Sequence, residues 1–230
     1  GSSWEEVGNY PAYSGASKFY EVPSTGLVLL PAYTYMGSSN DILVSVDNGL
    51  TFDYATFTAP KPHEVSEISE SFDGSKLYVP ARIGFTDLYI YTSHDGGITW
   101  SEREFVKSFG FHVGLRSVVE TSTHLFTHVG YYKGARYSHL YGRPKTATPG
   151  TNWTQILAAG NVIMSVKSGI YAGKYLIASY TEPSNYIYTS DDMLTWNNEV
   201  TLPSNWENIQ DINELSDGTF IICIASCFAL

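Results

Sequence analysis

The sequence predicts an all-β protein built from repeated four-stranded antiparallel units, and three observations support that prediction. A short turn motif, with an aspartate and a terminal Phe or Trp, recurs along the chain. Short apolar strands that follow Gly, Asp or Ser-Thr turn residues recur with it. No segment sustains a helical pattern of apolar residues over three turns.

The turn motif aligns without gaps in three segments. They read SVDNGLTF from Ser45, SHDGGITW from Ser93 and TSDDMLTW from Thr189. The aspartates follow one another at intervals of 48 and 96 residues; they are Asp47, Asp95 and Asp191. Because the second interval is twice the first, a further copy is expected near residue 143. That stretch reads LYGRPKTATPGTNW, and we interpret it as a degenerate copy that has lost its aspartate.

Each residue of the motif has an expected role in a hairpin turn. The aspartate carboxylate can accept hydrogen bonds from backbone N–H groups two residues on. Gly49 and Gly97 supply the positive φ that a tight turn requires. Met193 stands at the glycine position of the third copy, which predicts a looser or strained turn. The aromatic residues that end the motif are expected to anchor the core. They are Phe52, Trp100, Trp153 and Trp196.

Each repeat is expected to form four strands. In the second repeat these lie at residues 63–71, 76–82, 87–93 and 99–106, with the aspartate turn between the third and the fourth. Four-stranded units that repeat every 40–50 residues or so are typical of a β-propeller. We predict one five-bladed domain over residues 1–230, closed by its N- and C-terminal strands so that sheet edges are hidden. The blades are expected at 17–58, 64–106, 112–157, 161–201 and 207–230 together with 4–8, after a cloning remnant at 1–3.

The composition disfavours several classes of partner. The formal net charge is −10 and no Lys/Arg cluster interrupts it, so neither nucleic acid nor an anionic membrane is an expected partner. No apolar run approaches the roughly 20 residues of a spanning helix. The N-terminus lacks the layout of a signal peptide. The six histidines show no zinc-type spacing, and we predict no metal site and no cofactor. The 18 tyrosines fit a surface that recognises a partner by contact.

The turn motif resembles the Asp-box of sialidases and of other Asp-box (BNR repeat) propellers. In that family the box is structural and lies away from the ligand site. The resemblance therefore implies a structural role for the three aspartates, with a ligand site on the opposite face, formed by the second-to-third strand links and the links between blades. Candidate ligand-binding residues in those links carry an aromatic ring, a charge or a hydrogen-bonding group. They are Arg82, Tyr131, Tyr132, Arg136, Tyr180, Glu182, His63, His112 and Trp206. The same links hold Glu64 and Phe85.

Three functions remain open on the sequence. The first is a non-catalytic binding module for a cell-surface glycan or receptor, since no catalytic set is evident. Small Asp-box propellers of this kind resemble receptor-binding domains on bacteriophage tail fibres, which implies a virion or extracellular location within a larger, oligomeric polypeptide. The second is a sialidase-like hydrolase, although the F/Y-R-I-P motif of sialidases is absent and the chain has five arginines in all. The third is a propeller that binds a protein partner.

Overall fold

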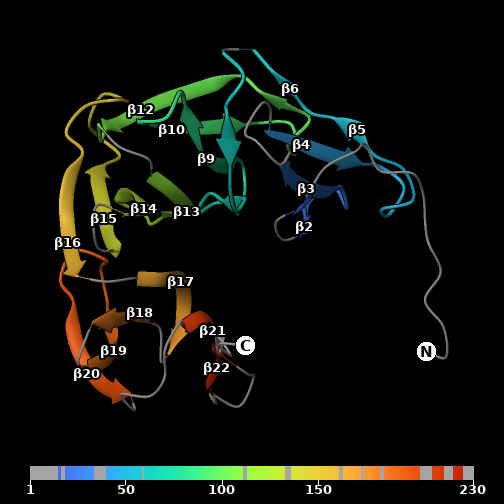
Figure 1. Ribbon diagram of the computed structural model, residues 1–230. Coiled ribbons are helices and arrows are strands. Elements are labelled where there is room, and N and C mark those ends of the chain that lie inside the picture. The colour runs from blue at the N-terminus through green and yellow to red at the C-terminus, as the bar shows by residue number, and fades with distance from the viewer. Residues whose placement is uncertain are drawn as a thin grey trace, which may run out of the picture. The chain divides into compact units, whose positions relative to one another are not determined.

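The computed structural model (Figure 1) describes residues 15–16, 19–33, 40–58, 60–110, 113–132, 136–160, 163–171, 174–181, 184–202, 209–214 and 220–224. The chain divides into two compact units, Gly1–Gly110 (unit 1) and Phe111–Leu230 (unit 2). Both units are built from β-sheets. Among the described residues, no helix has the length and apolar character needed to span a membrane.

Unit 1 holds two sheets of the same antiparallel design. The first sheet has the order β1-β3-β4-β5, with β2 also paired to β3. Its strands are β1 (Gly15–Ala16), β2 (Tyr20–Glu21), β3 (Val28–Tyr33), β4 (Asn40–Ser45) and β5 (Asp53–Tyr54). The second sheet has the order β12-β10-β9-β7, with β8 also paired to β9. Its strands are β7 (Glu64–Val65), β8 (Ser69–Glu70), β9 (Leu77–Ile83), β10 (Asp87–Ser93) and β12 (Glu102–Ser108).

A short parallel pairing ties these two sheets together. After the first sheet, β6 (Thr56–Phe57) runs beside β11 (Thr99–Trp100), which precedes the outer strand of the second sheet. The N–H of Thr58 extends the pairing by donating to the carbonyl of Trp100 at 3.3 Å. The segment that leaves the first sheet is thus bonded to the segment that leads into the outer strand of the second sheet.

The core of unit 1 fills the space between the two sheets. Alternate residues of the central strands point into it, because successive side chains of a strand face opposite sides. Leu29 and Ile42 of the first sheet and Val79 and Tyr91 of the second are fully buried in one cluster. Trp100 is also fully buried there, and its ring stacks on that of Phe57 at 6.3 Å. Burying a side chain of this kind contributes about 1.5–3 kcal/mol.

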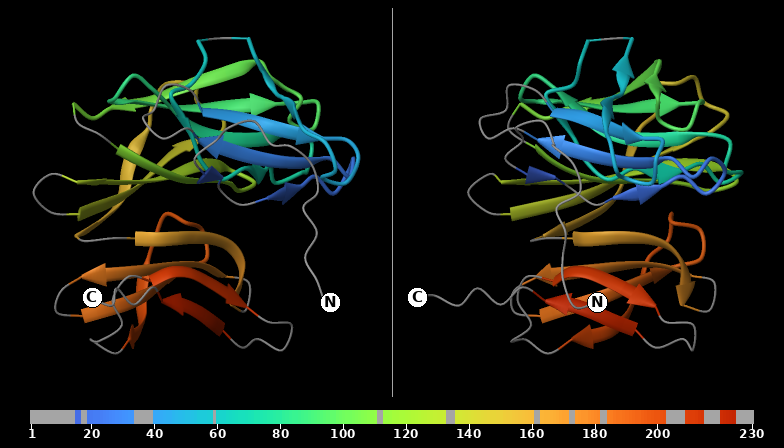
Figure 2. Two further views of the ribbon diagram at one scale, coloured as in Figure 1. Left: turned by 45° about the vertical axis from the view of Figure 1, so that its right-hand side comes forward. Right: turned by 90° about the vertical axis from the view of Figure 1, so that its right-hand side faces the viewer.

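Unit 2 continues the pattern with two four-stranded antiparallel sheets and a strand pair (Figure 2, green-yellow to red). The third sheet contains β13 (Val113–Glu120), β14 (His124–Tyr132), β15 (Arg136–Pro144) and β16 (Thr154–Gly160). The fourth contains β17 (Ile163–Tyr171), β18 (Lys174–Thr181), β19 (Ser184–Ser190) and β20 (Asn197–Leu202). The pair is β21 (Ile209–Glu214) and β22 (Phe220–Ile224).

The structure confirms an all-β protein with antiparallel four-stranded sheets in sequence order. In the third and fourth sheets each strand pairs with the next one along the chain, as a meander. The strand expected at residues 4–8, which would complete a fifth blade with β21 and β22, lies outside the described residues. The five-blade count and the closure of the ring stay predictions.

Candidate functional site

The Ser45–Thr51 turn between β4 and β5 is held by the carboxylate of Asp47. Ser45 Oγ donates to Asp47 Oδ1 (2.7 Å), and the backbone N–H and hydroxyl of Thr51 donate to the same carboxylate at 2.8 and 2.6 Å. These hydrogen bonds, led by that of the Thr51 hydroxyl, lower the pKa of Asp47 to about 2. Gly49, whose φ is 89°, donates its N–H to Ser45 Oγ (2.8 Å). The turn satisfies its own polar groups.

The Ser93–Thr99 turn between β10 and β11 repeats this geometry. Ser93 Oγ and the N–H of Thr99 each donate to Asp95 Oδ1 at 2.8 Å. Burial raises the pKa of Asp95, but the hydrogen bonds from Thr99 and Ser93 outweigh it, and the net shift is downward. Gly97 is required here for two reasons. Its φ is 92°, and a Cβ atom would lie 2.5 Å from Leu29 Cδ1.

The third copy uses a different aspartate from the one that the sequence predicts. Asp192 accepts hydrogen bonds from Ser190 Oγ (3.1 Å) and from the N–H groups of Leu194 and Thr195 (both 2.8 Å). Hydrogen bonding, led by the N–H of Thr195, lowers the pKa of Asp192. The prediction of this role for Asp191 is wrong, because the Ser-x-Asp pair lies one residue later than the gapless alignment places it.

Met193 explains the shift in register. The first two turns contain two successive residues with positive φ, Asn48–Gly49 and Gly96–Gly97, whereas the third has Met193 alone, at 60°. A residue with a Cβ is disfavoured at positive φ. The third turn therefore contains a single residue with positive φ and is one residue shorter than the first two turns. The Met193 side chain is fully buried and packs with Phe126 and Leu140. Trp196 Nε1 donates to its carbonyl (3.1 Å).

The four aromatic residues at the ends of the motif differ in their packing. Trp100 is fully buried, while Phe52 and Trp196 are half-buried and pack against hydrophobic clusters. Trp153, in the degenerate copy, is half-buried, and the guanidinium of Arg143 lies 5.6 Å from the centre of its ring. This is the geometry of a cation–π contact.

A further carboxylate turn, which the sequence analysis missed, joins β8 to β9. Ser71 Oγ donates to Asp73 Oδ1 (2.8 Å), and the N–H and hydroxyl of Ser75 donate to the same oxygen at 3.0 and 2.7 Å. These bonds, led by that of the Ser75 hydroxyl, lower the pKa of Asp73. The segment SFDGS carries the Ser-x-Asp signal, but it lacks the Thr-Trp ending by which the motif was recognised.

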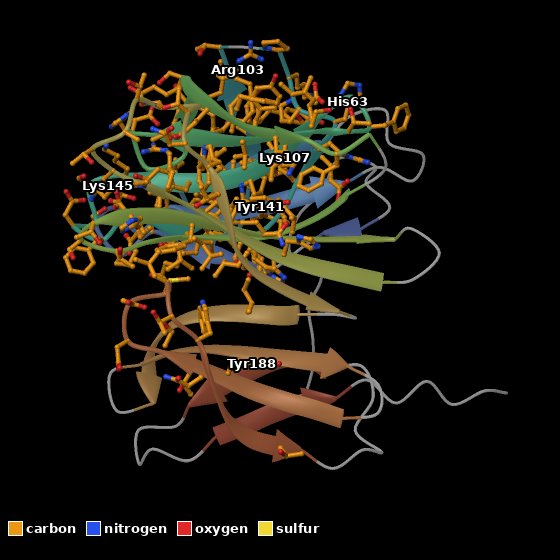
Figure 3. The ribbon with its side chains drawn as sticks, turned by 90° about the vertical axis from the view of Figure 1, so that its left-hand side faces the viewer. His63, Arg103, Lys107, Tyr141, Lys145 and Tyr188 are labelled. Carbon is orange, nitrogen blue, oxygen red and sulfur yellow. The ribbon has the colours of Figure 1, made fainter. Side chains whose placement is uncertain are left out.

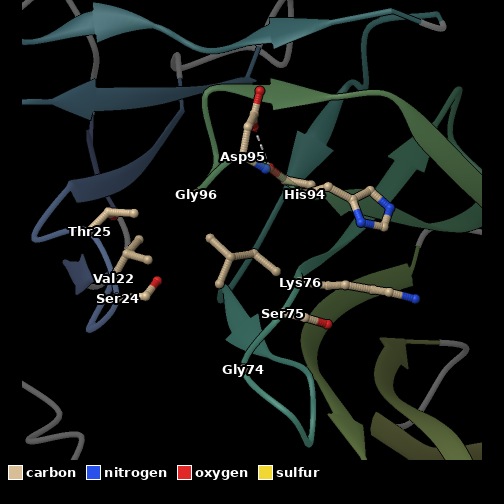
Figure 4. A pocket seen from close by; sticks show the side chains of 11 residues that line it. Val22, Ser24, Thr25, Gly74, Ser75, Lys76, His94, Asp95 and Gly96 are labelled. Atoms are coloured by element: carbon tan, nitrogen blue, oxygen red, sulfur yellow. Dashed lines mark hydrogen bonds between the residues drawn. The ribbon is translucent and has the colours of Figure 1, made fainter.

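These turns gather at one end of the two sheets of unit 1, which we call the carboxylate-turn end. Strand register places Ser45 beside Val28 and Ser93 beside Leu77, so the Ser-x-Asp turns and the turns before β3 and β9 share that end. A pocket of about 260 Å³ lies between them, with Thr25 on one wall and Asp95 on another (Figure 4). The hydroxyls of Ser75 and Ser93 in its lining already donate to turn aspartates. We therefore interpret this end as structural.

At the opposite end of the second sheet, Arg82 and Glu64 face each other from paired strands. β7 and β9 place the two residues directly opposite, and Arg82 Nη2 lies 2.6 Å from Glu64 Oε2. The Arg82 side chain is only 8% exposed, and among the described residues none accepts a hydrogen bond from its Nε or Nη1 atoms. A buried donor without a partner costs about 1–3 kcal/mol. Arg82 thus keeps two costly donors beside a carboxylate.

His63 and Phe85 complete this group, which we call the Arg82 cluster (His63, Glu64, Arg82 and Phe85). The N–H of His63 donates to the carbonyl of Arg82 (2.7 Å), and the N–H of Gly84 donates to His63 Nδ1 (3.0 Å). Because Nδ1 accepts, the proton of the neutral imidazole resides on Nε2. The His63 side chain is exposed (Figure 3). Phe85 is 76% exposed, with the Arg82 guanidinium 5.9 Å from its ring centre.

A second ion pair lies in the same part of unit 1. Lys61, two residues before His63, pairs with Asp41 at the start of β4. Asp41 is buried and Lys61 is half-exposed. Register places Asp41 beside Ala32, close to the end of the first sheet remote from its carboxylate turn. Links from both sheets of unit 1 therefore bring charged groups to the end opposite the carboxylate turns.

Some of the predicted ligand residues of unit 2 can be placed by backbone register alone. Tyr131 and Tyr132 end β14 and pair with the start of β15, where Tyr132 lies opposite Arg136. Tyr180 pairs with Asn185 at the β18–β19 link, while Tyr175 at the other end of β18 pairs with Ser190. Within their own sheets, these positions lie at the ends remote from the Trp153 and Ser190 turns. The remaining predicted residues lie outside the described residues; they are His112, Glu182 and Trp206.

Comparisons with known proteins identify the fold. No protein-family model and no curated protein matches the sequence. Among solved structures, the Hadza microbial sialidase Hz136 is 13% identical with a TM-score of 0.52, and the match covers 81% of this chain and 45% of that one. A subtype N10 neuraminidase-like protein of an isolate from the little yellow-shouldered bat in Guatemala is 11% identical with a TM-score of 0.50, covering 83% and 61%.

Identities this low show the fold alone. The chain is therefore similar in fold to sialidase-like β-propellers. It spans about half the length of the two solved structures.

Proposed function

We propose that this chain is a non-catalytic propeller that binds a glycan, or a receptor that carries one, through the end of unit 1 that holds the Arg82 cluster. The observation that carries the proposal is the buried Arg82 guanidinium, which lies 2.6 Å from the partly exposed Glu64 carboxylate and beside the exposed ring of Phe85. A sugar could donate a hydroxyl hydrogen bond to the Glu64 carboxylate, which Arg82 holds in place, and could cover the ring of Phe85.

The surroundings of Arg82 support the same chemistry. Small-molecule sites combine an apolar or aromatic surface with a few convergent polar groups. Phe85 supplies an exposed ring, and Glu64 and His63 supply polar atoms from an adjacent strand and link. The cluster lies at the end of the sheet opposite the Ser93 turn, where the resemblance to Asp-box propellers places the ligand site.

We further propose that the propeller has five blades and that residues 4–8 close the ring by joining β21 and β22. Each four-stranded sheet of this chain would then be one blade. The strand pair β21–β22 has fewer strands than the four main sheets, and an unpaired edge invites aggregation. The Ser-x-Asp turns support assignment to the Asp-box group.

For the biological setting, we propose an extracellular or virion-surface location, as a host-recognition domain within a larger, oligomeric polypeptide such as a bacteriophage tail fibre. The support is the resemblance to such receptor-binding domains, together with the acidic, tyrosine-rich composition.

The alternative is a sialidase-like hydrolase, for which several arginines would have to meet around one carboxylate. Two of the five arginines have other positions in the structure. Arg103 lies over the ring of Tyr89 at 5.3 Å, and Arg143 lies over Trp153 at 5.6 Å. Each guanidinium therefore stacks on an aromatic ring of its own unit, which weakens this alternative.

A glycan array combined with a fluorogenic sialoside assay tests the proposal. We expect saturable glycan binding without turnover, weakened about tenfold or more by Arg82→Ala, since a lost charged hydrogen bond costs about 1.5–3 kcal/mol. Arg103→Ala is the matched control and should bind as the parent does. Turnover abolished by Arg82→Ala would favour the hydrolase. Failure of every glycan, with capture of a purified protein receptor, would favour the protein-binding function.

A further inference from the structure

We infer that the Arg82 cluster selects a neutral sugar over an acidic one. The inference rests on the proposed function, because it names the class of glycan that the same site binds. Three features of the described residues lead to it: the balance of charge, the balance of hydrogen-bond donors and acceptors, and the exposed aromatic ring.

Two positive charges at this end of unit 1, those of Arg82 and Lys61, are paired with carboxylates. The Arg82 guanidinium lies 2.6 Å from the Glu64 carboxylate, and the Lys61 ammonium pairs with Asp41. These four groups have no net formal charge. A ligand carboxylate that reached Arg82 would also lie close to Glu64, and like charges at such distances in a partly buried site repel each other strongly. The net charge of −10 on the whole chain adds to that repulsion.

The hydrogen-bonding groups instead match hydroxyls. Arg82 Nε and Nη1 are buried, so the group of the pair that a ligand can reach is the Glu64 carboxylate. Glu64 can only accept; its Oε2 atom is occupied by Arg82, and the side chain is 28% exposed. A sugar hydroxyl can donate a hydrogen bond to the exposed part of this carboxylate. A ligand carboxylate accepts only, and it would leave Glu64 facing a second anion.

Phe85 supplies the apolar part of the site. Its ring is 76% exposed and lies beside the Arg82 guanidinium, 5.9 Å away. The C–H face of a sugar ring can cover such a surface while its hydroxyls reach the Arg82–Glu64 pair. The exposed side chain of His63 lies on the residue before Glu64. The cluster therefore offers an acceptor and an aromatic platform, with the charge of Arg82 paired.

The test uses the intact chain on an array in which neutral oligosaccharides of glucose, galactose, mannose, rhamnose and N-acetylglucosamine stand beside counterparts with a uronic or sialic acid. We expect the neutral members to bind at least tenfold more tightly than the acidic ones. Their affinities should change little between low and high salt, because a neutral sugar forms no ion pair with the protein. Preferential binding of acidic members, or a steep loss of affinity with salt, would overturn the inference and leave glycan binding intact. Binding of no glycan would overturn the proposed function itself.

Two variants with matched controls sharpen the test. Glu64→Gln keeps the shape of the side chain and frees the charge of Arg82, so the acidic counterparts should gain about tenfold, the size expected for one charged contact. Phe85→Ala should weaken the neutral sugars several-fold with an unchanged melting temperature, because the ring is exposed. Phe72→Ala, which removes a ring that is 65% exposed at the carboxylate-turn end, is the control and should bind normally. No gain for acidic sugars with Glu64→Gln, or equal losses in the two Phe variants, would contradict the inference.

Discussion

The two ends of the second sheet differ in how their charged groups are held. At the carboxylate-turn end, Asp73 and Asp95 accept hydrogen bonds from the serines, threonine and backbone of the turns that they close. At the other end, Arg82 holds a buried guanidinium with two donors that no described residue accepts. In the proposed function, the first end stabilises the fold and the second binds the ligand.

The largest expected effect on stability is at Gly97. Gly97→Ala would place a Cβ atom 2.5 Å from Leu29 Cδ1 at a φ of 92°, so strain and overpacking add. We expect a loss of about 2–4 kcal/mol, measured by urea unfolding. Gly49→Ala is the matched control, because its φ is 89° but its nearest contact is Phe52 at 3.9 Å. Equal losses in the two variants would show that packing against Leu29 contributes nothing.

A smaller effect distinguishes the two neighbouring aspartates of the third turn. Asp192→Ala removes the acceptor for Ser190 and for two backbone N–H groups, and we expect it to cost about 1–2 kcal/mol, as loss of a capping side chain does. Asp191→Ala should cost less than about 0.5 kcal/mol, as at ordinary surface positions. Thermal unfolding of both variants measures the difference. A larger loss of stability for Asp191→Ala than for Asp192→Ala would mean that Asp191 holds the turn, as the gapless alignment predicts.

The carboxylate turns also predict a pH dependence of stability. The pKa of Asp47 falls from an ordinary 3.8 to about 2 in the folded protein, because Thr51 and Ser45 bond to its charged form. A lowered folded pKa contributes stability that is complete above the unfolded pKa and is lost as the pH falls through the folded one. Unfolding free energies should therefore decline between about pH 4 and pH 2. Asp47→Asn should show a shallower decline, and an unchanged slope would contradict this assignment.

The smallest expected effect on stability is at the binding end. Replacing both partners in Arg82→Met/Glu64→Leu removes two buried charged groups at once, and such exchanges are often neutral or stabilising by about 1–4 kcal/mol. We expect no loss in urea unfolding, together with loss of glycan binding. A marked loss of stability would mean that the pair, like the carboxylate turns, is structural.

The parts of the fold that depend on local sequence could be predicted, and those that depend on steric detail could not. Ser45-x-Asp47 and Ser93-x-Asp95 hold their turns through bonds within seven residues, so the motif alone was sufficient. The third copy was misplaced because a gapless alignment ignores the Cβ of Met193, which limits the turn to one residue with positive φ. The Ser71–Ser75 turn uses a serine in place of the Thr-Trp ending.

The candidate site shows a similar division. Arg82 and His63 could be nominated from their links, but the pairing of Arg82 with Glu64 follows from the register of β7 on β9. The burial that leaves two donors without acceptors depends on packing, which no spacing in the sequence reports. The ion pair between Lys61 and Asp41 likewise joins links of two different sheets.

The most direct test of the difference between the two ends is an NMR titration of the labelled chain with the best neutral oligosaccharide from the array. We expect backbone amide shifts at residues 63–65 and 82–86, and none at the turns of residues 45–51 and 93–99. Shifts confined to those turns, or to the pocket between them, would contradict the assignment of binding to the Arg82 end.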